Sequence, residues 1–129
     1  MKHDSPSRYR ALPFTVLALV GGLSLGACNR QEDPAQTSRD MSEERAEGNE
    51  KINEATKDAV ENLNDGASAE TVVNDAHRIE VEKIRADHEV AKERCGGLPA
   101  PDQDKCRTDA DAAYDGAMKA ADAKLRTAP

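Results

Sequence analysis

The chain has 129 residues, a formal net charge of −7 and 2% aromatic residues. An acidic surface of this kind repels the phosphate backbone of nucleic acids, so a nucleic-acid-binding function is excluded from the leading hypotheses. So few aromatic residues cannot build a thick core, and alternating runs of β-branched residues are missing, so strands have little support. The composition therefore favours an all-α fold with thin, alanine-lined seams between helices.

The N-terminal segment has the order of a secretory signal. Lys2, Arg8 and Arg10 provide a basic stretch, and the uncharged apolar run ALPFTVLALVGGLSLGA follows from residue 11 to residue 27. A basic stretch followed by an apolar run is typical of signal peptides. We therefore predict that residues 1–27 form a signal peptide that is removed during export.

The apolar run ends with Leu25, Gly26, Ala27 and Cys28. This order resembles the lipobox of bacterial lipoproteins, in which a leucine and two small residues precede an obligatory cysteine. The resemblance implies that Cys28 is lipidated with a thioether-linked diacylglycerol and becomes the first mature residue. Because Asn29 rather than aspartate follows the cysteine, it also implies sorting to the outer membrane, with the protein facing the periplasm.

An uncleaved transmembrane anchor is the alternative interpretation of the same segment. Residues 11–28 are just long enough to span a bilayer as a helix. Pro13 and the Gly21–Gly22 pair would destabilise such a helix, and Cys28 would then stand at the end of the run by coincidence. The sequence therefore favours the lipoprotein over the membrane-spanning segment.

The segment after Cys28 predicts a flexible lipidated tether over residues 28–41. From Asn29 to Asp40 no apolar residue is larger than alanine, and Pro34 is expected to interrupt any helix. The helical domain is then expected over residues 42–126. Removing Lys2, Arg8, Arg10 and Asp4 leaves this mature chain with 15 basic and 24 acidic side chains, a net charge of −9.

Helix start and stop signals divide the domain into three helices. The first is predicted from the Ser42 cap to Asn64, with Asp65 and Gly66 as the stop. The second is predicted from the Ser68 cap to Arg94 or Cys95, and the third from Pro101 to about Arg126. The first helix has a weak apolar stripe formed by Met41, Ile52, Ala55, Ala59 and Leu63.

The second helix is apolar on two opposite faces. At 100° per residue, Val81 and Ile84 share a face with His77 and His88, whereas Ile79 and Val90 lie almost opposite. A helix with two apolar faces needs two neighbours. We therefore predict a flat, antiparallel arrangement of three helices with the second helix in the middle. The second and third helices form an antiparallel helical hairpin, and the first, N-terminal helix of the domain packs loosely against it.

The two remaining cysteines predict a disulfide. Cys95 and Cys106 are separated by the ten residues GGLPAPDQDK, which is not the paired spacing of a zinc site. In an exported protein the default state of such a pair is a disulfide, which would stabilise the fold by about 3 kcal/mol. The bridge sets the register of the hairpin, in which facing residue numbers should sum to about 201, so that Ala91 meets Ala110.

Residues 86–126 are similar to a recurrent region of small exported proteobacterial proteins. The similarity includes the segment AKERC, a short loop with a leucine, the second cysteine and an alanine-rich helix with one aromatic residue, Tyr114. Pro99 and Pro101 make this loop stiffer than the glycine- and asparagine-containing loops of those proteins. No activity is established for that group, so the resemblance implies an exported helical protein and no reaction.

His77 and His88 are the weak candidates for metal ligands. Eleven residues of helix separate them by about 16 Å, so the two side chains cannot share a metal within one helix. Glu80 and Asp87 are the nearby acids in the sequence, and a partly buried histidine at a helix seam is the commoner explanation. No metal site and no cofactor are therefore predicted.

These features together favour a non-enzymatic lipoprotein of the cell envelope. It would contact the membrane through its covalent lipid and act as a structural or protein-interaction module, with an envelope protein or a second copy as partner. One alternative is a protein that sequesters metals or small ligands through His77, His88 and its acidic face. Another is a modulator of an envelope enzyme, in which the loop from Gly96 to Lys105 would enter the enzyme's cleft.

Overall fold

The computed structural model describes residues 31–128, which fold into α-helices without a strand in this range. Helix α1 runs from Pro34 to Asn64, α2 from Ala69 to Gly96 and α3 from Ala100 to Thr127. The predicted all-α class is therefore confirmed. The predicted signal peptide and Cys28 lie outside the described residues. None of the described helices is long and apolar enough to cross a membrane.

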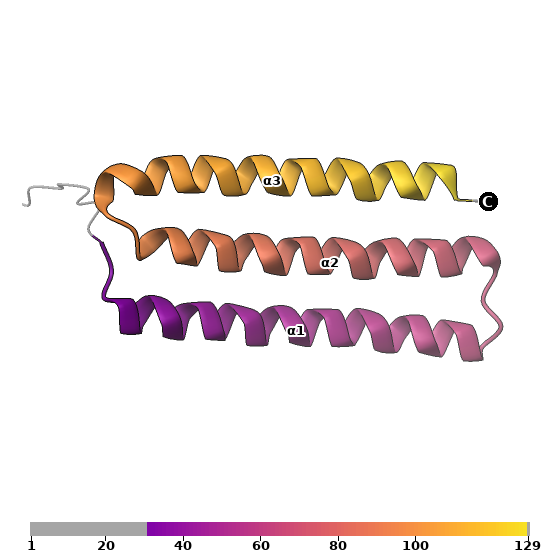
Figure 1. Ribbon diagram of the computed structural model, residues 1–129. Helices are drawn as coiled ribbons and strands as arrows, with labels where there is room; N and C mark the ends of the chain where they lie inside the picture. Colours follow the sequence, from indigo (N-terminus) through magenta and orange to yellow (C-terminus); the bar gives the residue numbers. More distant parts are fainter. Residues whose placement is uncertain (1–30, 129) are drawn as a thin grey trace, which may run out of the picture.

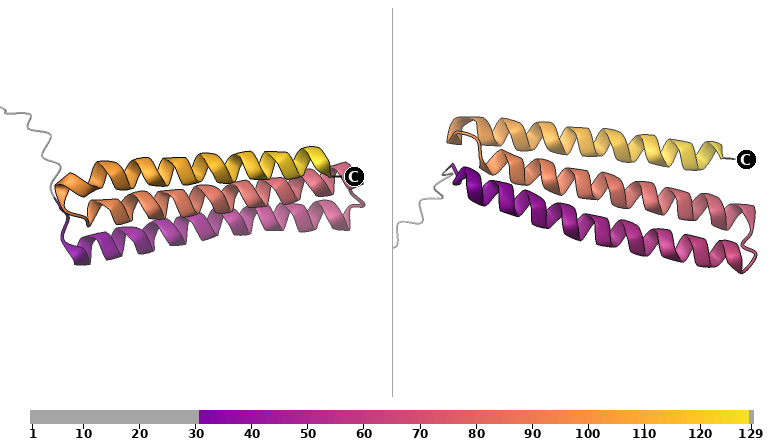
Figure 2. Two further views of the ribbon diagram at one scale, coloured as in Figure 1. Left: turned by 45° about the horizontal axis from the view of Figure 1, so that its top comes forward. Right: turned by 60° about the horizontal axis from the view of Figure 1, so that its bottom comes forward.

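The three helices lie side by side in a single layer with α2 in the middle (Figure 1). Helices α1 and α3 both pack against α2, and across residues 31–128 they do not pack against each other. Two further views show the same one-layer arrangement (Figure 2). A single layer has two broad faces in contact with solvent, so most of each helix surface is exposed.

The core of this layer is thin. Ala55, Val81, Cys95 and Ala121 are its buried hydrophobic residues among those described, and the large side chain of Gln103 is buried with them, at 1% exposure. The predicted stripe of α1 is only partly buried: Ala55 is covered, but Leu63 remains 55% exposed. With so little apolar burial, the close approach of small residues must supply much of the packing between helices.

Helix α1 begins at Pro34, and the predicted start at Ser42 is wrong. Asp33 is the N-cap: its side chain accepts a hydrogen bond of 2.8 Å from the backbone N–H of Ala35. Proline is well tolerated in the first turn, where its missing N–H has no partner to lose. The predicted flexible tether over 28–41 is therefore wrong from Pro34 onward, because this stretch is already helical.

The other helix ends follow the predicted signals. Ser68 caps α2, its hydroxyl accepting a hydrogen bond from the backbone N–H of Thr71. Gly66 follows α1 with a φ of 80°, a left-handed conformation that glycine adopts without steric cost. α3 begins at Ala100, one residue before the predicted start, so Pro101 is the second residue of the helix.

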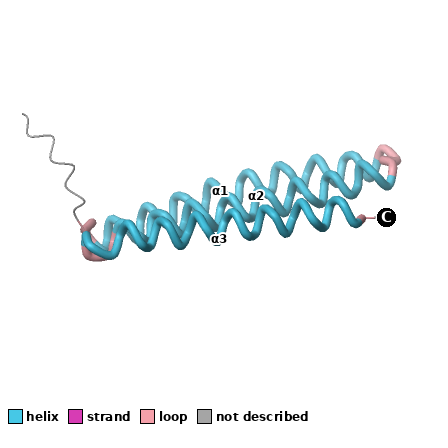
Figure 3. The backbone as a smooth tube through the Cα atoms, turned by 90° about the horizontal axis from the view of Figure 1, so that it is seen from above, coloured by secondary structure: helices cyan, strands magenta, loops and turns pink. Residues whose placement is uncertain are grey.

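Figure 3 shows that the turn between α1 and α2 lies at one end of the layer and that the loop between α2 and α3 lies at the other. The N-terminal end of α1 lies at the same end as the second loop (Figure 1). Residues 31–33, which lead into α1, are therefore close to the α2–α3 loop. We call this end of the layer the anchor-proximal end, because it carries the described residues nearest in the sequence to Cys28, where the lipid anchor is predicted.

Candidate functional site

The two cysteines of the α2–α3 connection are brought together. The sulfur atoms of Cys95 and Cys106 lie 2.01 Å apart, the distance of a disulfide, and their Cα atoms are 5.6 Å apart. Cys95 is completely buried. The predicted pairing is thus present, and it joins the end of α2 to the first turns of α3.

The loop that the disulfide closes is shorter than the sequence indicates. α2 continues to Gly96 and α3 begins at Ala100, so residues 97–99 alone connect them. The amide of the buried Gln103 donates hydrogen bonds to the carbonyl oxygens of Gly96, at 3.1 Å, and Leu98, at 2.9 Å. The helix predicted from Pro101 thus begins one residue earlier, at Ala100. The loop from Gly96 to Lys105 that the enzyme-modulator alternative requires is wrong, because only residues 97–99 of that stretch lie outside the helices.

The segment that precedes α1 is bound to the same loop. The backbone N–H of Glu32 donates to the carbonyl oxygen of Gly96 at 3.0 Å, and the side-chain amide of Gln31 donates to that of Gly97 at 3.0 Å. Thr37, which is buried, donates its hydroxyl proton to the Glu32 carboxylate at 3.2 Å. These contacts fix the start of the described chain against the disulfide loop.

Three carboxylates from different elements meet beside this contact. Oxygen atoms of Glu32, Asp40 and Glu93 all lie within 4.8 Å of one another. Burial, and then the negative charges of Glu32 and Asp40, raise the pKa of the Glu93 carboxyl. The sequence gives no sign of this cluster, because it depends on how α1 and the preceding segment lie on α2.

The histidines lie in separate places and pair with acids of α3. His77 Nε2 is 3.0 Å from Asp122 Oδ1, and His88 Nε2 is 2.7 Å from Asp111 Oδ1. The neighbours expected from the sequence, Glu80 and Asp87, are not these partners. Among residues 31–128, the cluster of potential metal ligands contains neither histidine.

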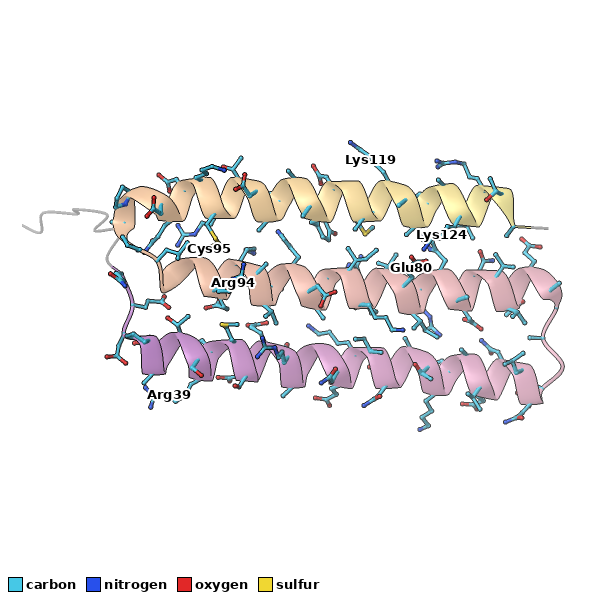
Figure 4. All side chains as sticks on the ribbon, viewed as in Figure 1. Arg39, Glu80, Arg94, Cys95, Lys119 and Lys124 are labelled. Carbon is cyan, nitrogen blue, oxygen red and sulfur yellow. A yellow bond between two sulfur atoms is a disulfide. The ribbon has the colours of Figure 1, made fainter. Side chains whose placement is uncertain are left out.

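His88 has a second contact across the same seam. Its ring stacks on Tyr114, with ring centroids 4.6 Å apart. Lys124 of α3 also reaches Glu80 of α2, whereas Lys119 points away from α2 (Figure 4). The residue numbers of the pairs His77–Asp122, His88–Asp111 and Glu80–Lys124 sum to 199, 199 and 204, near the expected 201. Their evident role is to align α2 with α3.

A shallow groove of about 700 Å³ runs along the layer and is lined largely by charged side chains of α1 and α2. Its cations are already paired: Arg78 contacts Asp58 and Asp75, and Arg85 contacts Glu82. The hydrogen bond from Arg78 to Asp58 raises the pKa of the guanidinium. The polar side chains that line the groove are therefore explained by ion pairs that stabilise the helix layer.

Comparisons with protein-family models, curated proteins and solved structures found no match.

Proposed function

We propose that this chain is a non-enzymatic lipoprotein of the cell envelope. Residues 1–27 direct export and are removed, and Cys28 carries the lipid that holds the protein at the outer membrane, facing the periplasm. The observation that carries the proposal is the run Leu25-Gly26-Ala27-Cys28 at the end of an uncharged apolar segment that follows a basic stretch. Two or more acyl chains anchor a protein firmly, whereas one alone holds it marginally.

The helical layer is proposed to act as an interaction module. The disulfide-closed hairpin of α2 and α3 forms its rigid part, and α1 packs on the other side of α2. Because the layer is one helix thick, both of its broad faces remain open to an envelope protein or to a second copy of the chain. The exposed apolar side chains Val60, Leu63 and Val72 near the α1–α2 turn support such a role.

Crosslinking in intact envelopes, followed by purification with the native lipid attached, tests the interaction role. We expect a reproducible crosslink to a protein of the envelope or to a second copy. A chain that crosslinks to lipid and never to protein would contradict this role while leaving the anchor itself intact.

Calorimetric titration with zinc, copper and calcium distinguishes the interaction module from the alternative, a protein that sequesters metals. His77 contacts Asp122, whereas His88 contacts Asp111 at 2.7 Å and Glu89 at 3.8 Å. The distance along α2 keeps the two histidines apart. The proposal of an interaction module predicts no binding tighter than about millimolar, which corresponds to roughly 4 kcal/mol. Micromolar binding of any of the three ions would favour the sequestering function instead.

A further inference from the structure

The loop between α2 and α3 (residues 97–99) and the first two residues of α3 present apolar side chains at the anchor-proximal end. Residues 97–101 have the sequence GLPAP and carry no charge; Pro99 and Pro101 are exposed and Leu98 is half-buried. An uncharged, proline-stiffened loop at the tip of an otherwise charged layer needs an environment that tolerates apolar side chains. The chain's own attachment point indicates which environment that is.

The start of the described chain limits how far this loop can be from the lipid. Gln31 and Glu32 are hydrogen-bonded to the carbonyl oxygens of Gly97 and Gly96. Three residues farther back along the chain stands Cys28. Three peptide steps span at most about 11 Å between Cα atoms, so a lipid on Cys28 would hold the loop close to the bilayer surface.

A shallow groove of about 320 Å³ adjoins Leu98 on the same end. Pro34 and Met41 supply apolar lining, and the side chains of Arg45 and Arg94 border it. Both arginines are exposed, and neither has an ion-pair partner among the described residues. Figure 4 shows Arg94 close to the end of α2 that carries Cys95. Apolar lining beside free guanidinium groups fits a phospholipid, whose phosphate pairs well with arginine.

We propose that the anchor-proximal end rests on the phospholipid surface that holds the chain's own lipid. The contact is made by residues 97–101, which are the loop and the first two residues of α3, and by the groove beside Leu98. The inference rests on the proposed lipidation of Cys28. Glu32, Asp33 and Asp102 lie at the same end, so attraction to anionic lipids is not the driving force. The helices then project from the bilayer surface. The opposite end of the layer lies about 40 Å from that surface, given the 28 residues of α2.

Single tryptophans test this orientation, because the wild-type chain contains none. The lipidated protein is reconstituted into phosphatidylcholine vesicles with brominated acyl chains, which quench nearby tryptophan. Leu98→Trp probes the loop, and Pro101→Trp repeats the measurement at the exposed second residue of α3, next to the loop. Leu63→Trp, at the distal end, is the matched control, and circular dichroism of each variant checks that the helices are retained.

We expect strong loss of emission in Leu98→Trp and Pro101→Trp and little loss in Leu63→Trp. Equal quenching at both ends would mean that the layer lies along the bilayer, and no quenching at either end would mean that it stays clear; both results overturn the inference. Flotation of the protein with the vesicles and the mass of the purified chain test, independently of the quenching, whether the chain carries a lipid anchor. A chain that neither floats nor carries acyl groups would overturn the proposed function together with the inference.

Discussion

Gly48 of α1 lies directly against Ala86 of α2, so closely that a Cβ atom on Gly48 would come within 2.5 Å of the Ala86 Cβ. Glycine in the middle of a helix costs roughly 0.5–1 kcal/mol relative to alanine. Its presence here is explained by the close approach of the two helices, which a side chain at this position would prevent.

The first prediction follows from this contact. Gly48→Ala should destabilise the fold by about 1–3 kcal/mol, because the alanine methyl group has no flexible neighbour to displace. Thermal unfolding followed by circular dichroism measures the change. The matched control is Gly116→Ala in α3, where no atom lies within 4 Å of the added Cβ; it should stabilise by about 0.5–1 kcal/mol. Equal effects of the two substitutions would show that α1 does not pack on α2 here.

The second prediction concerns the disulfide. Reduction, or the substitution Cys95→Ser, should lower stability by about 3 kcal/mol, since the bridge restricts the unfolded chain. The hydrogen bonds from the buried Gln103 to the carbonyl oxygens of Gly96 and Leu98 should break first, which would release the start of α3. Melting curves with and without reductant measure the change.

Thiol labelling provides the complementary check on the bridge. In protein taken directly from envelopes, Cys95 and Cys106 should react with a thiol reagent only after reductant is added. Complete labelling without reductant would contradict both the bridge and its stabilising role.

Local signals in the sequence predict some helix ends and miss others. The Ser68 cap and the Gly66 stop depend on neighbouring residues only, and both hold. The start of α1 is missed because Pro34 is interpreted as a helix breaker. A proline directly after Asp33 can also open a helix, and the sequence alone does not distinguish these roles.

Contacts between helices are harder to predict than the helices themselves. The acids that bind His77 and His88, namely Asp122 and Asp111, are distant in the sequence and meet the histidines through the register of α2 and α3. The contact of Glu32 with Gly96 depends on the path of the chain before α1. Neither has a local motif, because a contact of this kind is determined by packing and not by spacing.

The third prediction concerns pH. Burial and the neighbouring carboxylates raise the pKa of Glu93 from its ordinary value of 4.5. The folded chain therefore binds a proton here more readily than the unfolded chain, so the contribution of Glu93 to stability falls as pH rises through this range. Glu93→Gln should raise the melting temperature at pH 7 and remove part of this slope between about pH 4.5 and neutrality.

The control for this prediction is Glu50→Gln, at an exposed position of α1 outside the carboxylate cluster. It should leave the difference between melting temperatures at pH 5 and pH 7 nearly unchanged. If Glu93→Gln behaves like the control, or lowers stability at pH 7, the carboxylates do not repel one another in the folded chain.

The lipid on Cys28 is the central claim of the proposed function, and intact-mass spectrometry of the protein purified from envelopes tests it most directly. We predict a chain that begins at Cys28 and carries a diacylglycerol on its sulfur, and a Cys28→Ala variant without acyl groups. A wild-type chain with an unmodified residue 28, whether residues 1–27 are retained or removed, would contradict the account.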